Sequence, residues 1–340
     1  GFEHPVHESR ALSVADRVWF RESLGALDNK TISNTKLSAT ALEATFTNTH
    51  VYVTDGSAVT LSAGSQATLA TAYTGYIYAE NAAITIENGG ALGVGRLVLG
   101  DTGKTASFNM TGGVAFVQAA AYVGTNGAYV NMNVSGGQFY TSASGSIIIG
   151  GVDGHGRLNV SGTGSVYTGT LSLRENGTVS GTLYVQGASG TQQDVAGQTT
   201  VNYLELRGNS MIAGDLKIAT NAALSLVVSG NSTGFSATNI YGNLAIEGAS
   251  TLDIDLSNLI VDAMIEQSGL VLLIASNASG LDDLSINYTD PTGYTATIAW
   301  VDAGGGVQNL LLTVQAIPEP AMAARLMGLM SLLLVSRRRK

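Results

Sequence analysis

Several kinds of residue are scarce in this 340-residue chain, and each scarcity excludes a class of protein. Cysteine is absent, which rules out disulfide bonds, thiol nucleophiles and thiolate-bound metals. Only 4 residues are proline, and the 43 glycines lack the strict period of a collagen. Charged residues make up 12% and hydrophobic residues 45%, so the chain is too apolar for a disordered protein. The remaining Ala, Ser, Thr, Val and Gly favour many short strands joined by bends.

Basic charge is also scarce over most of the chain. There are 16 Lys and Arg against 25 Asp and Glu, and five of those basic residues lie in 325–340. Residues 1–320 therefore carry 11 basic and 25 acidic side chains, a formal charge of −14. Because a nucleic-acid-binding protein presents a basic surface to phosphates, the sequence predicts no nucleic-acid partner.

Two interleaved series of short motifs recur along the middle of the chain. FNMTGG, MNVSGG and LNVSGT begin at Phe108, Met132 and Leu158, after a looser copy, ITIENGG, at Ile84. LVLGDTG, YVGTNG, IIIGGVDG and LSLRENG begin at Leu97, Tyr122, Ile147 and Leu171. Both series keep a spacing of 24 to 26 residues, which leaves room for two or three short strands per unit.

Units this small cannot bury an apolar side alone, so they must stack on their neighbours. The sequence predicts an all-β fold, a parallel β-helix or β-solenoid of roughly 24–26 residues per turn. The apolar residues expected to point inward and stack are Phe108, Met110, Met132, Val134, Leu158 and Val160. Between them, Asn109, Asn133 and Asn159 are expected to form an outward ladder of amides hydrogen-bonded along the axis.

Four segments are predicted. Residues 1–44 form an N-terminal segment with a cap, including a helix within 8–27, and residues 45–260 form the solenoid repeats. Residues 261–316 form a C-terminal cap of longer antiparallel strands separated by DPTG and AGGG turns. Residues 317–340 form a tail with a single hydrophobic helix over 321–336. The chain begins GFEH without an apolar run, so we expect a mature or truncated form whose export signal lies upstream.

The tail has the composition of a short membrane span. Arg325 is its only charge between 321 and 336, and a helix of that length covers about 24 Å of a hydrocarbon core of about 30 Å. Arg337, Arg338, Arg339 and Lys340 follow directly and are predicted to stop transfer and stay on the cytoplasmic side. The rest of the chain would then face outside. A buried core helix is the alternative interpretation of the same segment.

Pro318, Glu319 and Pro320, followed by the apolar segment and the basic end, resemble the PEP-CTERM sorting signal of exopolysaccharide-producing Gram-negative bacteria. The resemblance implies recognition by an exosortase, a membrane-embedded protease that cuts near this motif. Pro318, Glu319 and Pro320 would then be recognition residues and not catalytic ones. Arg325 inside the apolar segment departs from the pattern. The repeats and the long-stranded ending are similar to autotransporter-passenger-like proteins.

Candidate chemical sites are few. Asp153, His155 and Arg157 are predicted to share one glycine-rich loop. Asp253 and Asp255 are predicted to share one side of a strand, where they could bind a calcium ion or simply form part of a solvated outer surface. The four histidines, His4, His7, His50 and His155, show no ligand spacing. The sequence therefore predicts no metal site, no cofactor and no catalytic residue.

Together these observations predict a non-enzymatic structural or adhesive protein of the cell surface or extracellular matrix. It would be exported, anchored transiently by its C-terminal helix and processed there by an exosortase. A glycan or exopolysaccharide is the expected contact of the solenoid. The alternative is a surface-displayed β-helix polysaccharide lyase or glycosidase, which would need carboxylates grouped on one exposed face.

Overall fold

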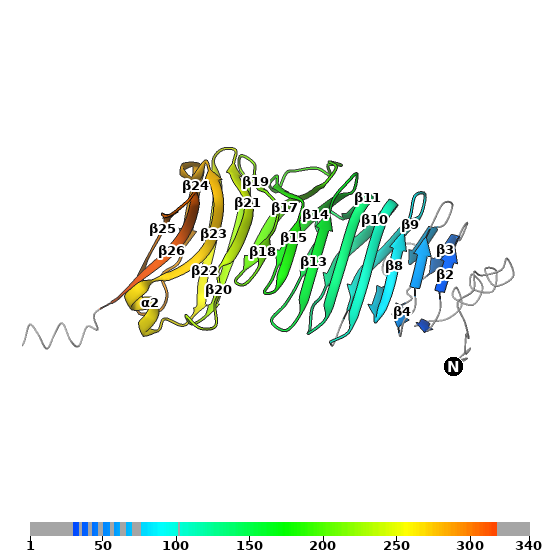
Figure 1. The fold of residues 1–340 in the computed structure, drawn as a ribbon, viewed down its shortest axis with the longest axis horizontal. Coiled ribbons are helices and arrows are strands. Elements are labelled where there is room, and N and C mark those ends of the chain that lie inside the picture. Colours follow the sequence, from blue (N-terminus) through cyan, green and yellow to red (C-terminus); the bar gives the residue numbers. More distant parts are fainter. Residues whose placement is uncertain are drawn as a thin grey trace, which may run out of the picture.

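The structure is a computed structural model that describes residues 76–100 and 103–317, together with six short strands between residues 30 and 69. In this part of the chain the strands belong to one 26-stranded sheet, whose pairings are parallel except at the C-terminal end. Figure 1 shows the strands side by side along one long axis. The predicted cap helix within 8–27 and the tail at 318–340 lie outside the described residues.

The sheet winds as a solenoid with three faces, because each strand pairs with the strand one turn further along the chain. Face A begins with the ladder of β1, β4 and β7, face B with that of β2, β5 and β8, and face C with that of β3, β6 and the first part of β9. The parallel pairing already starts at Lys30, so the solenoid begins earlier than the predicted residue 45. All-β character and a parallel solenoid are thus confirmed.

The strands have the following bounds. The first nine are β1 (Lys30–Ser33), β2 (Lys36–Ala39), β3 (Glu43–Phe46), β4 (His50–Thr54), β5 (Ala58–Leu61), β6 (Gln66–Leu69), β7 (Tyr76–Glu80), β8 (Ala82–Ile86) and β9 (Ala91–Leu99). The middle ones are β10 (Thr105–Val123), β11 (Tyr129–Thr141), β12 (Ser146–Ile149), β13 (His155–Val160), β14 (Ser165–Leu173), β15 (Gly177–Ser180), β16 (Thr182–Val185), β17 (Gln198–Arg207), β18 (Met211–Ile212) and β19 (Leu216–Ile218). The last are β20 (Ala223–Gly230), β21 (Thr238–Ile246), β22 (Ser250–Leu259), β23 (Leu270–Ser279), β24 (Leu284–Tyr288), β25 (Tyr294–Gly304) and β26 (Val307–Ala316), with helix α2 (Ala263–Ser268) and the 3-10 helix η1 (Leu281–Asp283) between them.

The interior is filled by the residues that the first motif series predicts. Ile84, Phe108, Met132 and Leu158 are consecutive partners across face B, which confirms spacings of 24, 24 and 26. These side chains are at most 1% exposed. The Phe108 ring also meets the ring of Phe139 on face C edge-on, with their centroids 5.7 Å apart. Stacking like residues from turn to turn therefore builds one continuous apolar core.

The second motif series is offset by one residue at its second copy. Leu97 pairs with Ala121, and Ala121 pairs with Ile147, so the true spacings are 24 and 26. Tyr122, the predicted partner, lies one position later and is half-buried on the outer side. The strict alternation of strand side chains decides this register, because a shift of one residue would turn Tyr122 into the core.

Paired glycines in the motifs mark the bend from face B to face C. Gly137 has a φ of +75°, a conformation that side chains rarely adopt. A Cβ on Gly136 would lie 2.3 Å from the carbonyl oxygen of Thr111 in the turn before. Glycine is required here because successive turns of backbone stack almost in contact at the bend.

Face C contains one strand more than the simple repeat. β17 pairs with both β14 and β16, so its first half lies between two strands that precede it in the chain. Residues 186–197 link the end of β16 back to the start of β17. The register step from Leu171 to Leu204 is therefore 33 residues. This insertion interrupts the repeat of 24–26 residues beyond residue 180. Parallel stacking then continues with Leu216 and Leu244, which are partners 28 residues apart.

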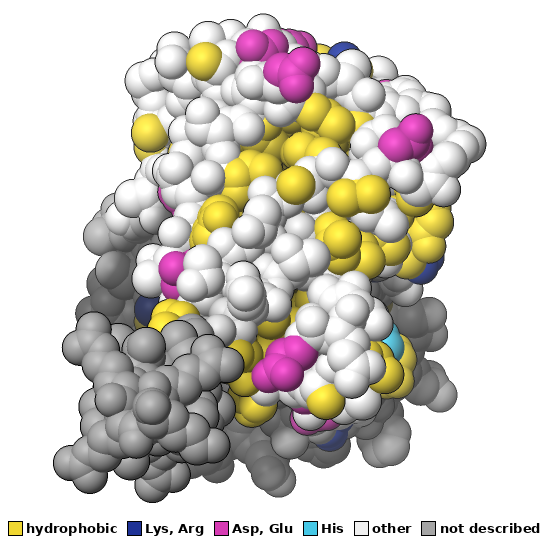
Figure 2. Space-filling model, turned by 90° about the vertical axis from the view of Figure 1, so that its left-hand side faces the viewer, with side chains coloured by type: hydrophobic (Ala, Val, Ile, Leu, Met, Phe, Trp, Pro, Cys, Tyr) yellow, Lys and Arg dark blue, Asp and Glu magenta, His cyan; other side chains and the backbone are white. Residues whose placement is uncertain are grey.

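The C-terminal end is only partly an antiparallel cap. β23 and β24 still pair in parallel with β21 and β22, which extends the solenoid beyond residue 260 to Tyr288. Antiparallel pairing is confined to β26 with β23 and with β25. Figure 2 looks onto this end and shows hydrophobic side chains across its middle with acidic ones near its edge. Val301 on β25 is 44% exposed, so the hairpin itself presents an apolar side chain to solvent.

Candidate functional site

The predicted sorting and orientation residues cannot be located in space. Pro318, Glu319, Pro320, Arg325 and the basic end at 337–340 all lie outside the described residues. Among the residues that the structure describes, no helix has the length and apolar character needed to cross a membrane.

The predicted loop with Asp153, His155 and Arg157 is wrong in part, because Asp153 lies in the bend before β13 whereas His155 and Arg157 lie on the outer side of β13 itself. All three side chains are exposed. The imidazole of His155 stacks on the ring of Tyr129, its neighbour in the ladder, with centroids 4.6 Å apart and planes 8° from parallel. His155 is thus engaged with an aromatic ring. Within 76–100 and 103–317, no three His, Asp or Glu side chains gather as a metal site would require.

Asp253 and Asp255 lie on the outer side of β22, while Leu252 and Ile254 point into the core, as the sequence predicts. Asp253 accepts a hydrogen bond from Asn287 Nδ2 at 3.0 Å. Hydrogen bonds from Ser257, helped by the charge of Arg207, hold the pKa of Asp255 below its usual range. Asp255 therefore stays ionised at neutral pH and is unsuited to act as a general acid.

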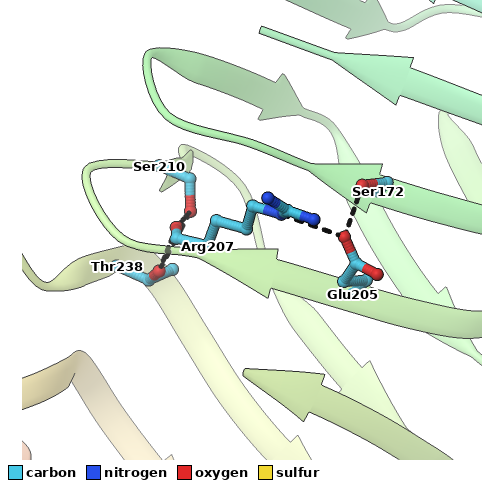
Figure 3. A network of polar contacts seen from close by, with 5 residues as sticks. All are labelled: Ser172, Glu205, Arg207, Ser210 and Thr238. Atoms are coloured by element: carbon cyan, nitrogen blue, oxygen red, sulfur yellow. Dashed lines mark hydrogen bonds and ion pairs between the residues drawn. The ribbon is translucent and has the colours of Figure 1, made fainter. Parts of the chain in front are cut away.

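A polar network next to these aspartates was not expected from the sequence (Figure 3). Glu205 Oε1 accepts hydrogen bonds from Ser172 Oγ at 2.8 Å and from Arg207 Nε at 3.2 Å. Glu205, Ser225 and Asp253 are successive partners in one outer row of face A. The row could not be found by spacing, because the inserted strand of face C shifts Glu205 out of the 24–26-residue period.

An open depression of about 520 Å³ lies where face C bends into face A, and we call it the corner depression. Its lining residues are Tyr76, Gly95, Arg96, Gln118, Ala119, Ser142 and Ser144. Tyr76 and Arg96 are ladder neighbours at the start of face A, and the guanidinium carbon of Arg96 lies 5.1 Å from the Tyr76 ring centroid. Such cation–π contacts are worth about 0.5–1 kcal/mol at exposed positions and hold the guanidinium in place.

Hydroxyl groups complete the corner depression. Ser142 Oγ donates to the carbonyl oxygen of Gln118 at 2.7 Å and lies 3.3 Å from Ser144 Oγ. Beside it on face C, the rings of Phe116 and Tyr140 lie 5.0 Å apart. An aromatic ring, a guanidinium and several hydroxyls thus meet in one open concave surface. These groups can pack against the apolar side of a sugar and hydrogen-bond its hydroxyl or carboxylate groups.

The corner depression was missed by sequence reasoning. Tyr76 and Arg96 are separated by 20 residues, which is outside the repeat spacing, so only the observed register shows that they are neighbours.

The predicted outer ladder of Asn109, Asn133 and Asn159, in contrast, is confirmed. Asn133 Nδ2 donates to Asn109 Oδ1 at 2.8 Å, and Asn159 Nδ2 donates to Asn133 Oδ1 at 2.7 Å.

The fold defines a class of protein, the parallel β-solenoids, and the comparisons with known proteins add no narrower identity. The chain matches no protein-family model and no curated protein.

Proposed function

We propose that this chain is an exported, non-enzymatic structural and adhesive protein that contacts glycans at the cell surface or in the extracellular matrix. The corner depression carries the proposal, because it combines Tyr76, Arg96 and Ser142 on one accessible concave surface. The solenoid supports the structural part of the proposal as well. The amides of the Asn ladder hydrogen-bond to one another along the axis, so the ladder stiffens the rod without a bound ligand. No cofactor or metal is part of this function.

Glycan binding is tested with polysaccharides immobilised on beads or in affinity gels, using exopolysaccharide fractions and pure polymers. Arg96→Ala removes the guanidinium over Tyr76 and should weaken binding at least about tenfold, the effect of losing roughly 1.4 kcal/mol. Arg157→Ala is the matched control, since Arg157 is an exposed arginine on face B. Equal binding by the Arg96 and Arg157 variants would remove the corner depression from the proposal.

The tail gives the proposed route to the surface. The PEP-CTERM-like motif at Pro318, Glu319 and Pro320 would be recognised by an exosortase, and the segment 321–336 would anchor the chain in the membrane until then. Tagged protein should change in size and location only when an exosortase is present. A double variant, Pro318→Ala with Glu319→Ala, should abolish that change; unaltered processing of the variant would contradict this route.

The alternative is a glycan-cleaving enzyme, and one observation favours it. Glu205 and Asp253 are two strands apart in one outer row, so their Cα atoms lie about 9.5 Å apart, and side chains on such a row can bring their carboxyl groups to the roughly 6.5–9.5 Å separation of inverting glycosidases. Against it, Arg207 and Ser172 already occupy Glu205 Oε1. Activity on a panel of polysaccharides that disappears in Glu205→Gln would replace the adhesive function with the enzymatic one.

A further inference from the structure

The inserted strand of face C creates a segment that no repeat explains. β16 and β17 are parallel neighbours, so the chain must return from the end of β16 to the start of β17. Residues 186–197 make this return, and we call them the strap. A parallel return of this kind must pass over a face of the sheet. Since the inner side is filled by the core, the strap lies on the outer side of face C.

One carboxylate of the strap is bound by the outer surface of face C. Asp194 accepts hydrogen bonds from Gln138 Nε2 and from Ser165 Oγ, one through each carboxylate oxygen. Gln138 and Ser165 are partners in the ladder of β11 and β14. Two neutral donors about 4.8 Å apart on a flat sheet thus hold a planar carboxylate between them. Ser165 is only 3% exposed, so its hydroxyl depends on this partner.

The rest of the strap is fastened by neutral amides. Gln186 Nε2 donates to Asn202 Oδ1 at 2.8 Å and to the carbonyl oxygen of Thr191 at 2.9 Å. Gln193 Nε2 donates to Gln186 Oε1 at 2.9 Å. Asp194 itself is exposed and lies in a stretch, Thr191–Ala196, whose side chains are all exposed. Asp194 can therefore leave the donor pair while Gln186 keeps the base of the strap attached.

The donor pair is aligned with the corner depression. Gln138 and Tyr140 occupy alternate positions on the outer side of β11, and Ser142, the first residue after the strand ends at Thr141, lines the depression. Ser142 follows Gln138 by four residue steps of extended chain, or about 13 Å. One oligosaccharide can span this distance, with Arg96 at one end and Gln138 at the other.

We propose that Gln138 and Ser165 form a carboxylate-binding subsite for a uronic acid residue of an acidic glycan, which Asp194 occupies as an internal competitor. The inference rests on the proposed glycan-binding function and names its ligand class. An acidic body cannot attract such a polymer at long range, so recognition depends on short-range donors. Displacing the Asp194 carboxylate by a ligand carboxylate exchanges equivalent hydrogen bonds and leaves Ser165 satisfied.

The test compares binding of polygalacturonate, a polyuronate, with binding of dextran, a neutral glucan, at about 150 mM salt. Asp194→Ala empties the subsite and should tighten polygalacturonate binding about tenfold, because the competitor no longer reduces the competent population. Dextran binding should stay unchanged. Asp153→Ala is the matched control, since it removes one exposed negative charge from the corner between faces A and B. Adding Gln138→Ala to Asp194→Ala should cancel the gain.

The outcomes separate this inference from the function on which it rests. Glycan binding that is lost in Arg96→Ala but is unaffected by Asp194→Ala would overturn the subsite and leave the proposed function intact. A tighter polyuronate complex of Asp194→Ala, with no effect of Arg96→Ala, would keep the subsite and remove the corner depression. An equal affinity gain in Asp153→Ala would show that the effect comes from net charge alone and would overturn the subsite.

A second measurement uses the wild type. Saturating polygalacturonate should speed hydrogen exchange in residues 191–196, and unchanged exchange there would contradict displacement of the strap.

Discussion

The central turns and the C-terminal turns of this solenoid solve the same stacking problem in different ways. Between Thr105 and Ser180, like residues stack on like, as Asn133 does between Asn109 and Asn159. Beyond Ala223 the inward residues remain alike, but the outer row pairs unlike residues, as when Asn287 donates to Asp253 at 3.0 Å. Helix α2 and the antiparallel β25 and β26 then end the winding. Rows of identical side chains favour the stacking of further turns, whereas the end of a solenoid needs side chains and strand pairings that do not repeat.

The largest expected effect is in the central core. Phe108→Ala would leave a cavity beside Phe139 where the Phe108 side chain is 0% exposed, and should lower the free energy of unfolding by about 3–5 kcal/mol. Urea denaturation followed by fluorescence and circular dichroism measures this. Tyr129→Ala, at a position of β11 that is 58% exposed, loses the stack on His155 and should cost only about 0.5–1.5 kcal/mol. Similar losses in both variants would refute a core built from the stacked motif.

A smaller effect is expected from the outer ladder of the same turns. Asn133→Ala removes the hydrogen bonds to Asn109 and Asn159 and should cost about 1–3 kcal/mol. Asn131, two residues earlier on β11, is exposed on the same face and is the matched control. Asn131→Ala should cost less than about 0.5 kcal/mol. If the two variants unfold at the same urea concentration, the ladder contributes nothing beyond its surface position.

The smallest expected effect is in the C-terminal turns, where one residue acts alone. Asp262 caps α2 through bonds from Met264 N at 3.1 Å and Ile265 N at 3.0 Å, and binds Ser232 through its other oxygen. The hydrogen bond from Ser232, followed by that from Ile265, lowers the pKa of Asp262 below its ordinary value of 3.8. The ionised carboxylate therefore adds stability above about pH 4, and this is lost as the pH falls through the lowered pKa.

Asp262→Ala should thus lower the thermal midpoint at pH 7 and lower it by less at pH 3. The reason is that wild-type Asp262 loses its own contribution as the pH falls. Thermal melts at the two pH values measure the gap between the two proteins. A gap of equal size at pH 7 and pH 3 would show that ionisation of Asp262 does not stabilise this end.

Much of the central region could be predicted because every turn repeats the same physical requirement. Phe108, Met132 and Leu158 occupy equivalent positions, and alternation in a strand decides which side each faces. The predicted position of Tyr122 is wrong by one residue, because a motif spacing of 25 does not distinguish inward from outward positions, whereas the pleat requires Ala121 to face inward. The parallel extension through β23 and β24 was missed because long apolar strands also suit an antiparallel cap.

The candidate sites were less predictable because they join positions of different turns. Arg96 meets Tyr76, and Glu205 shares an outer row with Asp253, at separations that no single motif encodes. Asp194 reaches Gln138 across 56 residues, through a strap that exists only because one strand is inserted. The candidate sites therefore depend on register, which is decided by the whole ladder.

The class of the fold, the inward and outward rows of the central turns and the acidic character of residues 1–320 all follow from the order of the amino acids alone. Alternation of apolar and polar residues indicates strands, and the repeat period indicates that these strands stack turn on turn. The position of the additional strand, the change to antiparallel pairing and the contacts between outer side chains are visible only in the folded chain. Those outcomes depend on pairing between distant segments, because parallel strands become neighbours only after a complete turn of chain.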